Sequence, residues 1–313
     1  MITVIKKYLN ILLKGIGMGA ANVIPGVSGG TIALLTGIFE RLINAIKSFN
    51  LKAFKLFFTG KWKDFAEHTD FKFLVSVFVG IAIAILTLAK LLEYLFENYP
   101  VLVWAFFFGL ILASVYFIGK RISKWSWQVI VIFILGVALA ISISVLKPSK
   151  ENDSVIYLLI SGAVAACSMI LPGLSGSFIL LLMGNYQLVM IDSINNLDFK
   201  ILIPVVVGAG VGLLAFSYIL SWIFKKYKDQ TLAILTGFIL GSLSILWPWK
   251  QTIETYIDRH EVIKPLVQKN ILPNAYAEIT GESSYLFFAI VLMIVGFAVI
   301  WIMEKSAEKI IDE

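Results

Sequence analysis

Two short segments combine helix-breaking residues with serine and glycine in a pattern that could bind an anion. The first covers residues 24–31 (IPGVSGGT) and the second covers residues 171–177 (LPGLSGS). Proline and glycine end one helix and let another begin. A helix that begins at Ser-Gly exposes unpaired backbone N–H groups and the positive end of the helix dipole, and glycine lets an anion approach the backbone closely. Two converging helix starts of this kind could therefore hold a phosphate or a carboxylate.

The candidate anion-binding residues are the hydroxyl and glycine residues at these helix starts. They are Ser28, Gly29, Gly30 and Thr31 in the first segment, and Ser175, Gly176 and Ser177 in the second. Asn22 could donate a hydrogen bond to the same ligand, whereas its counterpart in the second segment is Met169. The alternative interpretation is structural, because serine caps helices and glycine permits tight helix packing in membranes.

A charged pair, Glu40 and Arg41, ends the first apolar region. An arginine at the cytoplasmic membrane interface could make the first contact with an anionic head group. The alternative is an interfacial arginine that snorkels and pairs with Glu40. The corresponding residues of the second region are Gln187 and Leu188, so the charge is asymmetric.

The composition excludes several classes of protein. Of the 313 residues, 59% are hydrophobic and only 15% are charged, whereas a soluble domain has about 25% charged residues. A soluble enzyme, a disordered chain and a nucleic-acid-binding module are therefore excluded. One cysteine and two histidines cannot form a disulfide within the chain or a His/Cys zinc site, and we expect no metal and no cofactor.

The apolar segments predict an integral membrane protein. A spanning helix needs about 20 largely apolar residues. Six stretches meet this requirement, namely 73–92, 101–119, 125–146, 201–224, 231–249 and 285–303. Two further apolar regions, 15–39 and 155–191, contain the broken segments. We expect each to form a re-entrant helical hairpin that enters the membrane and returns to the same side, either at half depth or by two full crossings.

The basic residues predict the orientation in the membrane. With two returning hairpins, most lysines and arginines fall on the side of both termini, which the positive-inside rule assigns to the cytoplasm. The localisation is then the bacterial cytoplasmic membrane. The basic, aromatic segment 42–67 would attract anionic lipids on the inner face. The segment 250–284 has helix-like apolar spacing and is expected on the outer surface.

The two halves of the sequence repeat each other. The broken segments align at a separation of 147 residues, and Asp70 and Gly109 align with Asp198 and Gly237 at a separation of 128. Each repeat would contain one hairpin and three spans, and because three is odd the second repeat would be inverted, as in transporters. We therefore predict an all-α inverted-topology repeat whose hairpin tips meet near the midplane. The first repeat covers 1–146 (hairpin about 5–48) and the second covers 155–304 (hairpin about 155–191).

Residues 22–31 (NVIPGVSGGT), 37–43 (GIFERLI) and 171–177 carry a family resemblance. Over nearly its whole length the sequence resembles the bacterial polyprenyl-phosphate transporters (PopT type). The resemblance implies translocation of undecaprenyl phosphate, the carrier lipid of cell-wall synthesis, from the outer to the inner leaflet. It also implies that the tips, including Pro25, Gly26, Pro172 and Gly173, and the Glu40–Arg41 pair contribute to substrate binding.

Other functions remain open at this point. The motion of a lipid translocase with alternating access could be coupled to a proton or sodium gradient. One alternative is an ion-coupled transporter of a small organic anion. Another is an intramembrane lipid-phosphate enzyme, which commonly uses a nucleophilic histidine, but His68 and His260 lie in predicted loops, so we expect no enzyme. A membrane scaffold would not need Ser28, Arg41 or Ser175.

Overall fold

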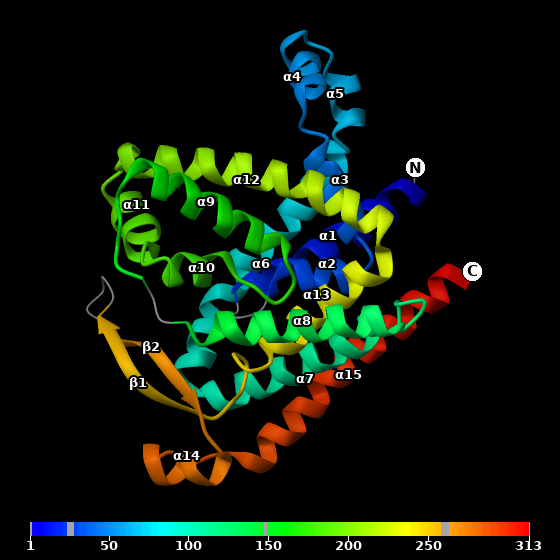
Figure 1. Cartoon of the computed structure of the whole chain (residues 1–313). Coiled ribbons are helices and arrows are strands. Elements are labelled where there is room, and N and C mark those ends of the chain that lie inside the picture. The colour runs from blue at the N-terminus through cyan, green and yellow to red at the C-terminus, as the bar shows by residue number, and fades with distance from the viewer. Residues whose placement is uncertain (1, 24–27, 147–148, 258–262, 313) are drawn as a thin grey trace.

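The computed structural model describes residues 2–23, 28–146, 149–257 and 263–312 (Figure 1). Within these ranges most residues are helical. Helices lie at the six predicted spans, namely α6 (Phe71–Asn98), α7 (Pro100–Gly119), α8 (Trp127–Ser144), α12 (Phe199–Lys226), α13 (Lys228–Ser242) and α15 (Leu286–Asp312). Helix α13 ends seven residues before the end of the span predicted at 231–249. Four of the described helices are long and apolar enough to cross a bilayer, and a bent helix pair would make a fifth span. The prediction of a helical, multi-pass membrane protein is confirmed at this level.

The outer faces of the long helices carry large apolar side chains that other parts of the chain do not cover. Leu86 is 80% exposed, Val206 is 66% exposed and Ile134 is 57% exposed. A soluble protein rarely exposes so much contiguous apolar surface. In a bilayer the same side chains face hydrocarbon, so these faces are lipid-facing.

The long helices pack in pairs. Helix α1 (Ile2–Val23) packs along α6, and α9 (Val155–Ile170) packs along α12, while α8 pairs with α13 and α7 pairs with α15. Glycine permits the close approach in the first two pairs. A Cβ atom on Gly80 would overlap the backbone of Leu12, and one on Gly208 would overlap the backbone of Leu159. Small residues at such contacts are typical of helix packing in membranes.

Each broken region forms a long helix followed by several short helical segments. After α1 come α2 (Gly29–Leu35) and α3 (Phe39–Lys47), which are bent by 117° relative to each other. After α9 come α10 (Gly176–Leu182), a π-helical turn η1 (Leu188–Asp192) and α11 (Ser193–Asn195). Helix α1 is about 33 Å long at 1.5 Å per residue. This first arm is longer than the apolar stretch from residue 15 predicted, because Lys14 does not interrupt the helix.

The helical expectation for residues 250–284 is wrong over its first part. Residues 250–257 and 263–270 form the antiparallel strands β1 (Lys250–Ile257) and β2 (Ile263–Asn270), with Lys250 opposite Asn270. Strand β1 is rich in threonine, isoleucine and tyrosine, which favour strands. Among the described residues of this segment, α14 (Pro273–Thr280) alone is helical before α15 begins.

The segment 42–67 is helical and projects from the rest of the molecule. It contains the end of α3, then α4 (Leu51–Phe58) and most of α5 (Trp62–His68), and Figure 1 shows α4 and α5 standing apart from the long helices. Leu51, Phe58 and Trp62 are exposed there. This projecting pair thus presents apolar and aromatic side chains among lysines.

Lys250 fixes the start of the β-hairpin against α7. Its Nζ atom lies 4.3 Å from the centre of the Trp104 ring and donates a hydrogen bond to the carbonyl of Ile245. Burial lowers the pKa of Lys250 from 10.5 to about 8. Nearby, the hydroxyl of Tyr276 donates to Glu282, and burial with this contact raises the pKa of Tyr276 to about 12.

These pKa values predict how stability changes with pH. Between about pH 8 and 10.5 the unfolded state binds more protons at Lys250 than the folded state does, so the free energy of unfolding should rise with pH in this range. The thermal unfolding midpoint in detergent should therefore rise because of Lys250 when the pH is raised from about 7 to about 9.5, a range in which Tyr276 of the folded protein stays protonated. The Lys250→Met variant should lack this gain, and the exposed-lysine control Lys200→Met should keep it. Equal pH profiles for the wild type and Lys250→Met would contradict the assignment.

Candidate functional site

The two broken segments touch each other. The Ser28 hydroxyl, at the start of α2, donates to the carbonyl of Met169 over 3.2 Å. The backbone N–H of Gly173 donates to the Thr31 hydroxyl over 3.2 Å. Ser28 and Thr31 are both buried. Residues more than 140 positions apart in the sequence are thus joined by two hydrogen bonds at the place where both helices are interrupted.

The N–H groups at the start of α2 already have partners inside the protein. The Gly29 N–H donates to the side-chain oxygen of Asn22 over 2.7 Å, and the Gly30 N–H donates to the Ser28 hydroxyl over 3.1 Å. The Thr31 N–H donates to the Ser28 carbonyl over 2.9 Å. Asn22 thus accepts a hydrogen bond from the backbone through its side-chain oxygen. The donor role predicted for its side-chain NH2 group stays a prediction.

The start of α10 is less enclosed. Ser175 and Ser177 share a hydrogen bond of 2.7 Å between their hydroxyls, and Ser177 is exposed. The Ser175 side chain does not cap the first turn of this helix. Gly176 is buried against α9. Of the two helix starts, the second is the one that presents hydroxyl groups outward.

The remaining residues predicted at the tips have structural positions of their own. Pro172 is buried, and Gly173 adopts a left-handed conformation with φ of 83° where it packs against the backbone of Phe238. A side chain at Gly173 would be strained in this conformation and would meet α13. Pro25 and Gly26 lie outside the described residues.

Two basic side chains bind the carboxyl end of α2. Arg121 donates through Nη1 to the Leu34 carbonyl over 2.9 Å and through Nη2 to the carbonyl of the next residue. Lys14 donates to the Thr36 carbonyl over 2.8 Å. Positive charge at a helix carboxyl end is favourable because it opposes the negative end of the dipole. The corresponding carbonyls at the end of α10 accept from neutral groups instead, the Ser149 N–H and the Tyr157 hydroxyl.

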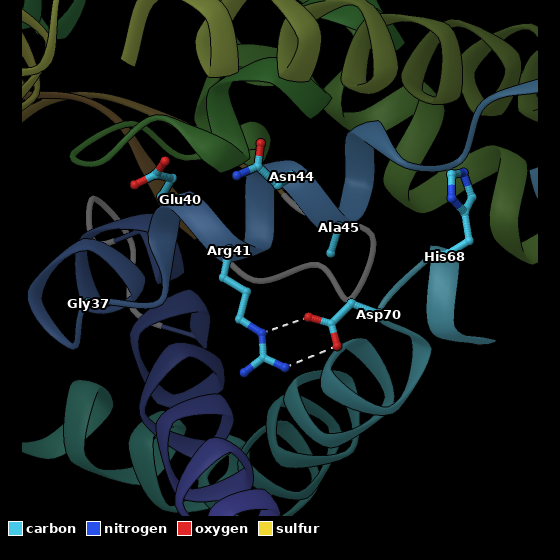
Figure 2. Close-up of a pocket in the computed structure, with 7 residues that line it drawn as sticks. All are labelled: Gly37, Glu40, Arg41, Asn44, Ala45, His68 and Asp70. Atoms are coloured by element: carbon cyan, nitrogen blue, oxygen red, sulfur yellow. Dashed lines mark hydrogen bonds and ion pairs between the residues drawn. The ribbon is translucent and has the colours of Figure 1, made fainter. Parts of the chain in front are cut away.

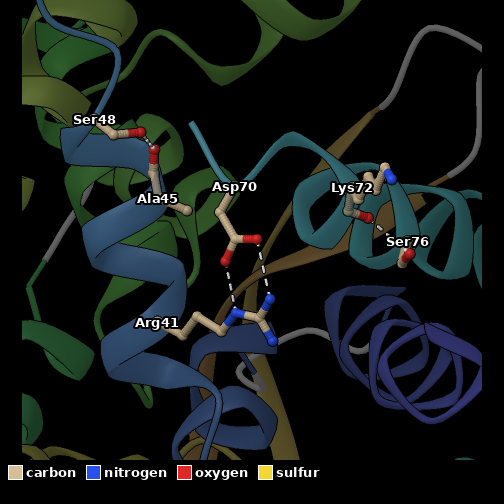
Figure 3. Close-up of polar contacts among 6 residues, drawn as sticks. All are labelled: Arg41, Ala45, Ser48, Asp70, Lys72 and Ser76. Atoms are coloured by element: carbon tan, nitrogen blue, oxygen red, sulfur yellow. Dashed lines mark hydrogen bonds and ion pairs between the residues drawn. The ribbon is translucent and has the colours of Figure 1, made fainter. Parts of the chain in front are cut away.

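Arg41 is paired with Asp70 and not with Glu40. Its Nε atom lies 2.6 Å from Oδ2 of Asp70, and its Nη2 atom lies 3.0 Å from Oδ1 (Figure 3). The guanidinium also lies 4.2 Å from the centre of the Phe73 ring. The interpretation that Arg41 pairs with Glu40 is therefore wrong, because the side chain points toward the start of α6. Two parallel N–H donors of this kind match a carboxylate or a phosphate equally well.

The Arg41–Asp70 pair lies in an open hollow of about 480 Å³ (Figure 2). The hollow is lined by Gly37, Glu40, Arg41, Asn44, Ala45, His68 and Asp70. His68, predicted to be a solvated loop residue, lines it and lies 3.2 Å from the side-chain oxygen of Asn50. The pair is about one-third exposed, so an anion in the hollow could reach Arg41 and compete with Asp70.

Asp70 and its repeat counterpart Asp198 have different roles. Asp198 caps α12 by accepting a hydrogen bond from the Lys200 N–H over 3.0 Å. Asp70 does not cap α6 with its side chain, and its backbone adopts a left-handed conformation with φ of 48°. Its carboxylate is committed to Arg41 instead.

The contact between the two tips predicts a measurable loss of stability. In Thr31→Val, the buried N–H of Gly173 loses its acceptor, which should reduce the free energy of unfolding by about 1 to 2 kcal/mol. Thr236 is the matched control, because it is also buried but its hydroxyl donates to a carbonyl of its own helix. Thermal unfolding in detergent should show a lower midpoint for Thr31→Val than for Thr236→Val. Equal midpoints would argue against the tip contact.

Comparisons with known proteins agree on one family. The profile of a family described as "undecaprenyl phosphate translocase-like" matches residues 18–264. A "polyprenyl-phosphate transporter" from Vibrio cholerae is 42% identical over 302 residues, which cover 96% of this chain and 98% of that protein. A protein of the same name from Staphylococcus aureus is 32% identical over 260 residues, covering 77% of this chain and 87% of that protein. No solved structure matches the chain significantly.

Proposed function

The chain belongs to the undecaprenyl phosphate translocase-like family, and on this premise we propose that it carries undecaprenyl phosphate across the bacterial cytoplasmic membrane from the outer to the inner leaflet. The observation that carries the proposal is the contact between the start of α2 and the second broken segment, made by Ser28 with Met169 and by Thr31 with Gly173. Both relatives named above are polyprenyl-phosphate transporters. A lipid phosphate needs a polar site of this kind because its head group must cross about 30 Å of hydrocarbon.

The proposal includes an inverted repeat of residues 1–146 and 155–304, and the helix packing supports it. In such a repeat α1 and α6 correspond to α9 and α12, and both pairs are packed together. Helix α7 corresponds to α13 and α8 corresponds to α15, so the packed pair α7–α15 corresponds to the packed pair α13–α8. With an odd number of spans in each repeat, the two hairpins enter from opposite faces. The distribution of basic residues then places both termini in the cytoplasm.

The head group would bind between the two tips. The exposed Ser177 hydroxyl, with Ser175 beside it, offers the first donors at the start of α10. Donors at the start of α2 become available when Asn22 releases the Gly29 N–H. A phosphate that accepts from both sets of donors replaces the Ser175–Ser177 and Gly29–Asn22 hydrogen bonds, each of which lies within one hairpin. In this proposal the loss of these bonds loosens both tips and couples binding to their separation, as alternating access requires.

Arg41 would receive the head group on the cytoplasmic side. Its guanidinium already holds the Asp70 carboxylate through two N–H groups in an open hollow. A phosphate can take the place of that carboxylate with the same geometry.

The projecting helices α4 and α5 would lie on the inner membrane surface. Their exposed side chains include Leu51, Phe58 and Trp62, and lysines lie between these residues. Apolar residues inserted at the interface and lysines near anionic head groups together favour such binding. We propose that this pair gathers anionic lipids next to the Arg41 hollow.

Variants of the ion pair separate a binding role of Arg41 from a structural one. Arg41→Ala should reduce the appearance of undecaprenyl phosphate in the cytoplasmic leaflet by about tenfold or more, and Arg41→Lys should not restore it because lysine lacks the two parallel donors. Asp70→Asn should retain activity, because the cation remains. A leaflet-specific assay in membranes with equal amounts of inserted protein measures this, with the exposed Lys124→Ala as control. If Asp70→Asn loses as much activity as Arg41→Ala, the pair is structural.

A glycine at the tip contact tests the site independently. A Cβ atom on Gly30 would overlap the carbonyl oxygen of Ile170 in the other hairpin. Gly30→Ala should therefore force the tips apart and abolish transport. Gly210→Ala on α12 is the matched control, because a Cβ atom there meets open space. Normal transport by an inserted Gly30→Ala variant would refute a head-group site at the tips.

A further inference from the structure

An apolar groove of about 760 Å³ runs between α8 and α12, with α13 as its floor. Ile132 lines it from α8, Phe216 and Ile223 line it from α12, and Ile234 and Phe238 line it from α13. Its volume lies in the range of small-molecule sites, about 300 to 1,000 Å³. The two tips and the Arg41 hollow are polar, so the groove is of a different chemical kind.

One end of the groove reaches the second hairpin tip. Leu171, which precedes Pro172, lines the groove. Phe238 lines it as well, and its backbone packs against Gly173, whose N–H donates to Thr31. The groove therefore ends at Leu171, between Met169 and Gly173, which make the contact between the two hairpins.

The other end of the groove has the composition of a membrane interface. Trp222 and Tyr227 line it there and are both more than 40% exposed. The ammonium group of Lys226 lies 5.2 Å from the centre of the Trp222 ring and 5.3 Å from that of Tyr227. Aromatic residues with lysine mark the level of the lipid head groups. The groove thus leads from the tips to one membrane surface, the cytoplasmic one in the proposed orientation.

We infer that this groove holds the isoprenoid tail of the lipid, next to the head group, while the phosphate is bound at the tips. The inference rests on the proposed function. In a polyprenyl phosphate the first isoprene unit is attached directly to the phosphate, so a tail that begins at the tip enters the groove at Leu171 and Phe238. A glycerophospholipid would place its ester groups against these two apolar residues, where the esters have no polar partner and lose their hydration.

Binding measurements on the purified full-length protein test the inference. The ligands are undecaprenyl phosphate, geranyl phosphate, inorganic phosphate and phosphatidylglycerol. Ile132→Trp and Ile223→Trp fill the groove from opposite walls, and Ile219→Trp is the control because Ile219 on α12 is 54% exposed and does not line the groove. The wild type should bind undecaprenyl phosphate more tightly than geranyl phosphate. Each filled variant should weaken undecaprenyl phosphate binding by about tenfold, or about 1.4 kcal/mol, and leave inorganic phosphate binding unchanged.

The outcomes distinguish the groove from the function as a whole. If the wild type binds no polyprenyl phosphate, the proposed function fails together with the groove. If both filled variants bind undecaprenyl phosphate as tightly as the wild type, or if phosphatidylglycerol competes as well as undecaprenyl phosphate, only the groove assignment fails. A photoreactive isoprenoid phosphate gives a measurement on the wild type that needs no variant. Labelling of α8, α12 and α13 supports the groove, and labelling confined to other helices overturns it.

Discussion

The structure depends on how two interrupted helices satisfy their backbone polar groups inside an apolar bundle. Hydrocarbon offers no hydrogen bonds, so each N–H and C=O group at a break needs a partner within the protein. At the amino end of α2 the partners are Asn22 and Ser28, and at its carboxyl end they are Lys14 and Arg121. These contacts position a helix of only seven residues that could not form alone.

Corresponding positions in the two halves of the sequence carry different charges. Cations bind the carboxyl end of α2, whereas neutral donors bind that of α10. Asp70 holds an arginine, whereas its counterpart Asp198 caps a helix. A carrier that releases an anion on one side benefits from such asymmetry, because a fully symmetric protein would hold the ligand equally well in both directions. In the orientation proposed above, the hairpin at which these charges lie enters the membrane from the cytoplasm.

Hydropathy and helix-breaking residues predicted the long helices and the two interruptions, because these depend on local composition. The β-hairpin was missed because the apolar spacing of Thr252 and Tyr256 fits a helix as well as a strand, and β-branched content decided the outcome. The partner of Arg41 was missed because Asp70 lies 29 residues away in another element. Arg121 was missed for the same reason, since 86 residues separate it from the carbonyl it binds at the end of α2. Long-range contacts of single side chains leave no periodic pattern in a sequence.

Two hydrogen bonds hold the start of α2, one from the Gly29 N–H to Asn22 and one from the Gly30 N–H to Ser28. The chemistry of this pair of bonds, called the latch below, has a consequence for energetics. An amide and a hydroxyl hold the start of α2, and neither group ionises at physiological pH. Opening this latch thus takes up or releases no proton. A phosphate monoester, in contrast, has a second pKa of about 6. The pH would therefore affect this step through the charge of the bound phosphate, which sets how strongly the phosphate competes for the N–H donors. The charge of the latch itself would not change.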